Sequence, residues 1–213
     1  MRKNFIYKDL VNSENFYSPI FEAIFNNNWK YYNNNAPAKS STKRIQDTLN
    51  AGLDNFYYIN RILYKYNQCF FKLLTEGEVL VAFPLVRIQI ENLCAIYAEV
   101  KHPFEILYRI FEKGNRLEDI KRNNIYIKPS EIRKEIDEIF GTNIVELYKK
   151  YSGFIHPSIA QTKVKIKTYY KESEGNKAIK KYIKLYEQDM VLVNQTITKV
   201  LLTYLENIKL KNK

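Results

Sequence analysis

The sequence is poor in the residues that interrupt regular secondary structure or cross-link a chain. It has six glycines and six prolines in 213 residues, which argues against a turn-rich β-sandwich and for long helices. Its two cysteines, Cys69 and Cys94, are too few for a disulfide framework, and both fall in apolar helical stretches. We therefore expect them to be small core residues in a reducing compartment.

Motifs that define several enzyme classes are also missing. The chain has no G-x-x-x-x-G-K-[ST] phosphate loop, no G-x-G-x-x-G, no H-E-x-x-H and no nucleophile elbow. Its two histidines and two cysteines are far apart, without the spacing of zinc ligands. Nucleotide hydrolysis and zinc chemistry are therefore not expected, and we expect no cofactor.

Long hydrophobic segments are absent as well. The N-terminus has no sustained apolar stretch of the kind found in signal peptides. The longest apolar run, VLVAFPLV at 79–86, is too short to span a bilayer. We expect a cytoplasmic protein that does not interact with membranes.

What the chain does contain is enough apolar material for one core, and an excess of positive charge. Hydrophobic residues make up 46% of the chain, and its length fits one domain or one domain with an appendage. The net charge is +11 and the pI is near 9.4. Basic proteins favour phosphate-rich partners because each contact releases counterions from nucleic acid, although a solvated lysine-rich surface gives the same excess.

Hydrophobic periodicity and helix-end residues predict an all-α chain. Residues 1–41 are expected to form a helical arm and linker, and residues 42–213 a bundle of long antiparallel helices. The first long helix is either continuous or broken near Gly52, and Pro84 either kinks the second or marks its start. Residues 163–170 form either a short strand or an extended loop. The expected helices cover 42–75, 79–100, 103–113, 130–140 with Ser130 as cap, 142–154 with Thr142 as cap, and a last helix over at least 179–204.

The last helix carries a heptad seam, which predicts a partner helix packed along it. The partner is either a neighbour in the same bundle or a second copy of the chain. The seam residues follow one another at steps of four and three: Ile179, Ile183, Tyr186, Met190, Val193, Ile197, Val200 and Tyr204.

Arg87 is the one positive charge in an apolar stretch of the second long helix. A buried arginine needs an acceptor, and Glu91 lies four residues on, on the same helix face. The pair is either an internal ion pair that fixes packing or a site arginine that the glutamate holds in position.

His156 lies where a short amphipathic helix ends, because the residue before Pro157 avoids the helical conformation. Ser152 and Ser158 flank it. The imidazole either caps the turn through hydrogen bonds or acts as a general acid/base or phosphate contact near neutral pH.

Two sequence elements together resemble the HEPN-like superfamily. They are an R-x-x-x-E in a buried middle helix, Arg87 and Glu91, and a later Y-S-x-x-x-H-P-S at Tyr151–Ser158. The chain looks closest to a branch with an S-x-x-x-H-P element, over about residues 45 to 205. This resemblance implies a helical bundle that forms a homodimer. It also implies a metal-independent ribonuclease of a toxin–antitoxin, abortive-infection or other antiviral system.

The family's signature is an arginine followed by a histidine five to seven residues later. His156 matches the histidine, but the arginine position falls on Lys149, Lys150 and Tyr151. Arg87 is the candidate to replace the missing arginine from another helix. His156 would then act as acid/base, Arg87 would stabilise charge in the transition state, and Glu91 would orient Arg87. The expected substrate contacts are Lys149, Lys150, Tyr151, Ser152 and Ser158.

Lysines interleaved with tyrosines over 163–171 suit either single-stranded nucleic acid or a protected edge strand. We expect an RNA-acting protein of a bacterial defence or toxin–antitoxin module, as an active endoribonuclease or a degenerate relative. The alternative is a catalytically inactive helical module that binds RNA or a protein partner such as an antitoxin.

Overall fold

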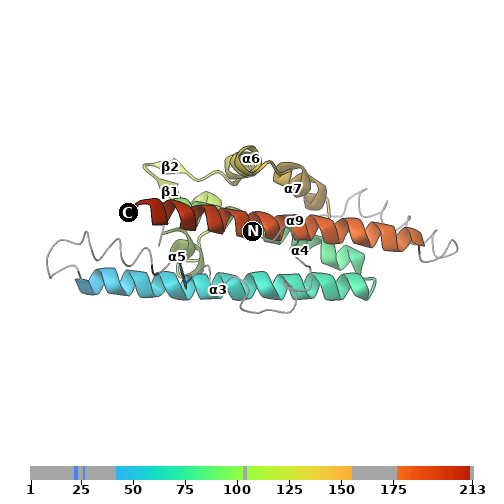
Figure 1. Cartoon of the computed structure of the whole chain (residues 1–213), viewed down its shortest axis with the longest axis horizontal. Coiled ribbons are helices and arrows are strands. Elements are labelled where there is room, and N and C mark those ends of the chain that lie inside the picture. Colours follow the sequence, from blue (N-terminus) through green and yellow to red (C-terminus); the bar gives the residue numbers. More distant parts are fainter. Residues whose placement is uncertain (1–21, 24–25, 27–41, 103–104, 155–176, 212–213) are drawn as a thin grey trace.

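A bundle of helices runs along the length of the molecule (Figure 1). The computed structural model describes residues 22, 23, 26, 42–102, 105–154 and 177–211, and for 42–53, 177–182 and 208–211 it describes the backbone alone. The expected all-α class is confirmed. The long helices are α3 (Thr42–Thr75), α4 (Val79–Lys101) and α9 (Lys177–Lys211), and the shorter ones are α5 (Ile106–Phe111), α6 (Pro129–Phe140) and α7 (Ile144–Ser152).

Helix α4 is the centre of the bundle. It packs against α3, α9, α5, α6 and α7, and Figure 1 shows it between α3 and α9, with α6 and α7 on the upper side of the view. Its side chains are apolar almost all round because neighbours cover it on nearly every side. Among the described helices α4 alone is long and apolar enough to cross a membrane, with 56% of the tested window buried. A core helix passes the same test, so this finding does not locate the protein.

The helix bounds follow the expected pattern closely. Helix α3 runs without a break through Gly52. Helix α4 begins at Val79, five residues before Pro84, so Pro84 does not mark the start of the helix. Gly77, in the turn between the two helices, has a φ of +82°, a conformation that favours glycine.

The expected cap at Ser130 is wrong. Helix α6 begins at Pro129 with Lys128 as the flanking residue, so Ser130 already lies inside its first turn. Proline is favoured at the first helical position because its missing N–H would have no partner there. Gly141 ends α6 with a φ of +62°, as expected.

The expected cap at Thr142 is also wrong. The carboxylate of Asp137, on the preceding helix, accepts hydrogen bonds from the N–H groups of Ile144 at 2.6 Å and Val145 at 3.0 Å. The Thr142 hydroxyl donates to the same carboxylate at 2.6 Å. A charge reaching back from α6 therefore satisfies the first turn of α7, and Thr142 only supports it.

A short hairpin was not expected. Strand β1 (Lys121–Arg122) pairs antiparallel with β2 (Ile125–Tyr126), after the 3-10 turn Leu117–Asp119. Asn123 and Asn124 join the strands with φ values of 47° and 65°. Asparagine tolerates positive φ at both positions of such a two-residue turn. The short strand or extended loop expected at 163–170 lies outside the described residues.

The heptad seam of α9 packs inside the chain. Met190, Val193, Ile197 and Val200 are at most 2% exposed, and α4 is the helix that contacts α9 most extensively. The prediction that the partner of this seam is a neighbouring helix of the same bundle is therefore confirmed. The homodimer stays a prediction, and the side chain of Ile179 is not among those that the structure describes.

The two cysteines differ in burial. Cys94 is buried as expected, but Cys69 is exposed, so its assignment to the core is wrong. The buried stripe of α3 passes through Asn67 and Phe70, and Cys69 points away from it.

Candidate functional site

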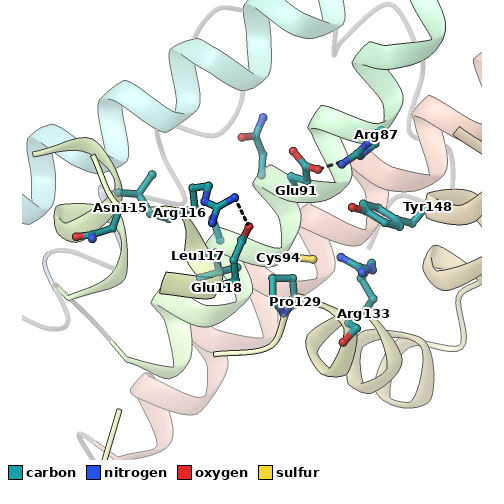
Figure 2. Close-up of a pocket in the computed structure, with 14 residues that line it drawn as sticks. Arg87, Glu91, Cys94, Asn115, Arg116, Leu117, Glu118, Pro129, Arg133 and Tyr148 are labelled. Atoms are coloured by element: carbon teal, nitrogen blue, oxygen red, sulfur yellow. Dashed lines mark hydrogen bonds and ion pairs between the residues drawn. The ribbon is translucent and has the colours of Figure 1, made fainter. Parts of the chain in front are cut away.

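A hollow of about 730 Å³ opens on one side of α4, a size typical of ligand sites (Figure 2). Helices α4, α5, α6 and α7 and the segment before the hairpin all contribute to it. The lining residues are Arg87, Glu91, Asn92, Cys94, Ala95, Ile110, Asn115, Arg116, Leu117, Glu118, Pro129, Ser130, Arg133 and Tyr148.

The expected Arg87–Glu91 pair is present and borders this hollow. The Nε of Arg87 donates to Oε1 of Glu91 at 3.0 Å. The Arg87 side chain is 22% exposed and that of Glu91 is 47% exposed, so the pair lies at the edge of the bundle. A hydrogen bond to a carboxylate fixes the direction of the guanidinium and compensates its charge.

Two guanidinium groups approach one aromatic ring. The Cζ atom of Arg133 lies 3.7 Å from the centre of the Tyr148 ring, and that of Arg87 lies 5.1 Å from it. Figure 2 shows Arg87 above Tyr148 and Arg133 below it in the view. Attraction between cations and the ring face offsets part of their mutual repulsion. Three helices therefore hold two positive groups at the same wall of the hollow.

Arg133 differs from most arginines of the structure in its charge balance. The structure describes six arginine side chains, and four of them pair with a carboxylate: Arg87, Arg109, Arg116 and Arg122. Arg61 and Arg133 have no carboxylate partner among the described residues. The charge of Arg133 is therefore open to an anion from outside.

Cys94 contacts Arg133 without neutralising it. Burial raises the pKa of the Cys94 thiol to about 12, against the opposing effect of its hydrogen bond and charge interaction with Arg133. The thiol is therefore protonated at neutral pH and supplies no negative charge to the guanidinium.

The far wall of the hollow carries a compensated arginine. Arg116 donates from Nε to Asp119 at 3.0 Å and also pairs with Glu118 at 3.5 Å. The hydrogen bond from Arg116 lowers the pKa of Asp119. The uncompensated charge of the hollow is therefore concentrated at Arg133.

The first turn of α6 adds to this positive end. Pro129 and Ser130 line the hollow, and Ser130 lies three residues before Arg133 on the same helix face. No side chain caps this helix start, whose N–H groups carry partial positive charge.

The expected contact residues on α7 do not line this hollow, and their polar groups are engaged within the chain. Lys149 pairs with Glu146 at 3.2 Å, and Lys150 with Asp189 of α9 at 2.5 Å. The hydroxyl groups of Tyr151 and Ser152 are engaged in the same way. The buried Tyr151 donates its hydroxyl to Asp189 at 2.7 Å, and the Ser152 hydroxyl donates to the Tyr148 carbonyl at 2.6 Å.

His156 and Ser158 lie outside the described residues. Of the expected catalytic group, the structure therefore places Arg87 and Glu91 together, and the approach of His156 to them is not described. Among the described residues no group of three or more histidine, cysteine or acidic side chains could hold a metal ion.

Comparisons with protein-family models, with curated proteins and with solved structures give no match. The HEPN-like resemblance therefore rests on the sequence elements alone, and the site is interpreted from its own chemistry.

Proposed function

We propose that the protein is an RNA-binding helical module of the HEPN-like kind, and that the hollow beside α4 holds a phosphate of the RNA. The observation that carries this proposal is the partly buried Arg133, which stacks on Tyr148 and has no carboxylate partner among the described residues. A fixed guanidinium matches the geometry of a phosphate and can bind it through two hydrogen bonds.

The charge of the hollow supports a single phosphodiester as the ligand. Arg87 pairs with Glu91, and Arg116 pairs with Glu118 and Asp119, so the charge of Arg133 remains for a ligand. One internal phosphate carries one negative charge and balances it. The net charge of +11 of the whole chain favours the approach of a polyanion.

A polynucleotide suits the hollow better than a bare anion does. One face of the Arg133 guanidinium lies on Tyr148, and the planar group can contact a base or a phosphate on its other side. Single-stranded RNA is often recognised through such contacts with arginine planes together with its phosphates.

The proposal extends to metal-independent cleavage in a bacterial defence or toxin–antitoxin module. His156 would be the general acid/base, Arg87 would stabilise the charge that develops on the phosphate, and Glu91 would orient Arg87. The hydrogen bond between Arg87 and Glu91 supports the last of these roles.

A non-catalytic module that binds RNA, or a protein partner such as an antitoxin, is the second candidate. The observation in its favour is that the expected contact residues on α7 form ion pairs or hydrogen bonds within the chain. These residues are Lys149, Lys150, Tyr151 and Ser152. These residues then hold α7 in place and leave the ligand to the hollow.

The binding test compares two arginines. We expect Arg133→Met to weaken binding of a single-stranded RNA about tenfold, since a charge-assisted hydrogen bond contributes about 1.5 kcal/mol or more. The slope of log K against log salt should fall by about 0.7 for one lost phosphate contact. Arg61→Met is the matched control, because Arg61 is exposed on α3, outside the hollow. Equal losses in the two variants would show general charge attraction and contradict the proposed site.

The cleavage test uses the two histidines. Purified protein is incubated with mixed cellular RNA in EDTA, beside His156→Ala and His102→Ala. We expect cleavage to be lost in His156→Ala alone, with unchanged thermal stability. RNA binding without cleavage by any of the three proteins would favour the non-catalytic module.

A further inference from the structure

Asn92 lines the same hollow and is tied to the interior of the bundle. Its side chain is partly buried on α4, next to Glu91. Its Nδ2 donates a hydrogen bond to Oε1 of Gln89 at 3.2 Å. The other groups of the Asn92 amide, Oδ1 and the second N–H, make no hydrogen bond with a described residue.

The orientation of the Gln89 amide is determined by its other partners. Gln89 is fully buried, and its Nε2 lies 3.4 Å from the carbonyl oxygen of Leu63 and 3.1 Å from Oδ1 of Asn194. A backbone carbonyl can only accept, so the nitrogen of Gln89 must face α3 and α9. Its oxygen then faces Asn92.

The Asn194 amide is anchored in the same way. Its Nδ2 donates to the carbonyl oxygen of Met190 at 2.8 Å and to Oδ1 of Asn67 at 2.9 Å. Asn67 returns a hydrogen bond from its Nδ2 to Oδ1 of Asn194 at 3.0 Å. Backbone carbonyls of α3 and α9 therefore fix the direction of every amide in this chain of hydrogen bonds.

This network sets what Asn92 presents to a ligand. Because the Gln89 oxygen only accepts, Asn92 must turn its NH₂ group toward it. Oδ1 and the second N–H of Asn92 are then left for a ligand, in an order that the network sets. An amide fixed this way complements a base edge that offers one donor and one acceptor.

We infer that Asn92 recognises an adenine base whose phosphate lies at Arg133, and that it is the specificity-determining residue of the site. This inference rests on the proposed RNA binding. The recognised edge is the Hoogsteen edge, where adenine alone offers a donor, N6, beside an acceptor, N7, for the Oδ1 and Nδ2 of asparagine. Guanine offers two acceptors there, O6 and N7, and would repel Oδ1. A cavity of about 730 Å³ has room for a base beside the phosphate.

The test measures affinities for single-stranded RNAs of about eight nucleotides that differ only at one central base. We expect the wild-type protein to prefer adenine at that position by about tenfold, the discrimination typical of a bidentate contact. Asn92→Leu should reduce this preference below about twofold, mainly by lowering the affinity for the adenine oligonucleotide. Asn207→Ala is the matched control, because Asn207 is exposed on α9 and does not line the hollow, and it should keep the preference.

The outcomes separate the two proposals. Equal wild-type binding of all four oligonucleotides, a preference for another base, or an adenine preference that survives in Asn92→Leu would overturn the inference and leave RNA binding standing. Binding of no oligonucleotide would overturn both. Asn92→Ser, which keeps a hydroxyl donor toward Gln89 but loses the paired donor and acceptor, should lose the preference too, and it replaces Asn92→Leu if that variant unfolds at a lower temperature.

Discussion

The guanidinium of Arg133 lies over the ring of Tyr148, with 3.7 Å between Cζ and the ring centre. Arg133 belongs to α6 and Tyr148 to α7, so the pair joins two short helices that both pack on α4. The ring contacts the guanidinium without neutralising it, and no described carboxylate pairs with its N–H groups. Tyr148 is therefore a positioning residue for the charge that we propose binds phosphate.

Replacing the Tyr148 ring should weaken RNA binding without removing a charge. We expect Tyr148→Leu to raise the Kd about three- to tenfold, because a cation–π contact contributes about 0.5–1 kcal/mol when exposed and up to about 2 when desolvated. Tyr148→Phe keeps the ring and should bind like wild type. A similar loss in both variants would mean that the hydroxyl, and not the ring, matters.

The Asp137 carboxylate should contribute far more to the free energy of unfolding than the side chain of the next residue on α6, Glu138. It accepts from two N–H groups at the start of α7 and from the Thr142 hydroxyl. We expect Asp137→Ala to lower the free energy of unfolding by about 2 kcal/mol, at the upper end for a cap because its acceptor is charged. Glu138→Ala, at an exposed position one residue on, should change it by less than about 0.5 kcal/mol. Urea unfolding measures both, and equal effects would contradict the cap.

The long helices could be predicted from the sequence because their apolar residues follow one uninterrupted period. Helix α3 matches its expected bounds, and α4 differs by one residue at its end. The seam of α9 correctly indicated a partner helix. The pair Arg87 and Glu91 was found because a spacing of four residues fixes a contact within one helix.

The rest of the site depends on how separate helices meet. Arg133 and Tyr148 lie 15 residues apart, on two helices whose relative placement the charge at Asp137 helps to set. In the sequence Tyr148 is one residue of a short amphipathic helix, and nothing there marks it as a partner of Arg133. Arg133 sits beside the buried stripe of Ile132 and Ile136, and no local pattern separates it from a solvated arginine.

The ion pair of Lys101 and Glu135 should stabilise the fold in a pH-dependent way. Partial burial raises the pKa of Glu135, but hydrogen bonds from Lys101 and Tyr97 outweigh this and lower it below 4.5. A carboxylate with a lowered pKa in the folded state stabilises the fold above its unfolded pKa, and the gain is lost as the pH falls through the folded value.

The variant Lys101→Met tests the predicted direction of this pH dependence. The free energy of unfolding of the wild type should be higher than that of the variant by less than about 1 kcal/mol, since both side chains of the pair are partly exposed. The difference should be constant well above pH 4.5 and shrink below it. Lys134→Met, which removes the same charge from an exposed position of α6, should show no such pH-dependent difference from wild type. A difference for Lys101→Met that persists into acid would show that packing of the lysine chain, and not the charge pair, stabilises the fold.

The buried amides should behave as one coupled unit. Asn194 is fully buried and bonds both Asn67 and Gln89, so Asn194→Leu leaves partners on two other helices unsatisfied. We expect it to lower the free energy of unfolding by about 3 kcal/mol, because each orphaned buried polar group costs about 1–3 kcal/mol. The double variant Asn67→Leu with Asn194→Leu removes both partners of the central pair and should lose less than the sum of the two single changes. A strictly additive double variant, measured by urea unfolding, would show that the two asparagines contribute independently and that the network does not hold Gln89 in its orientation.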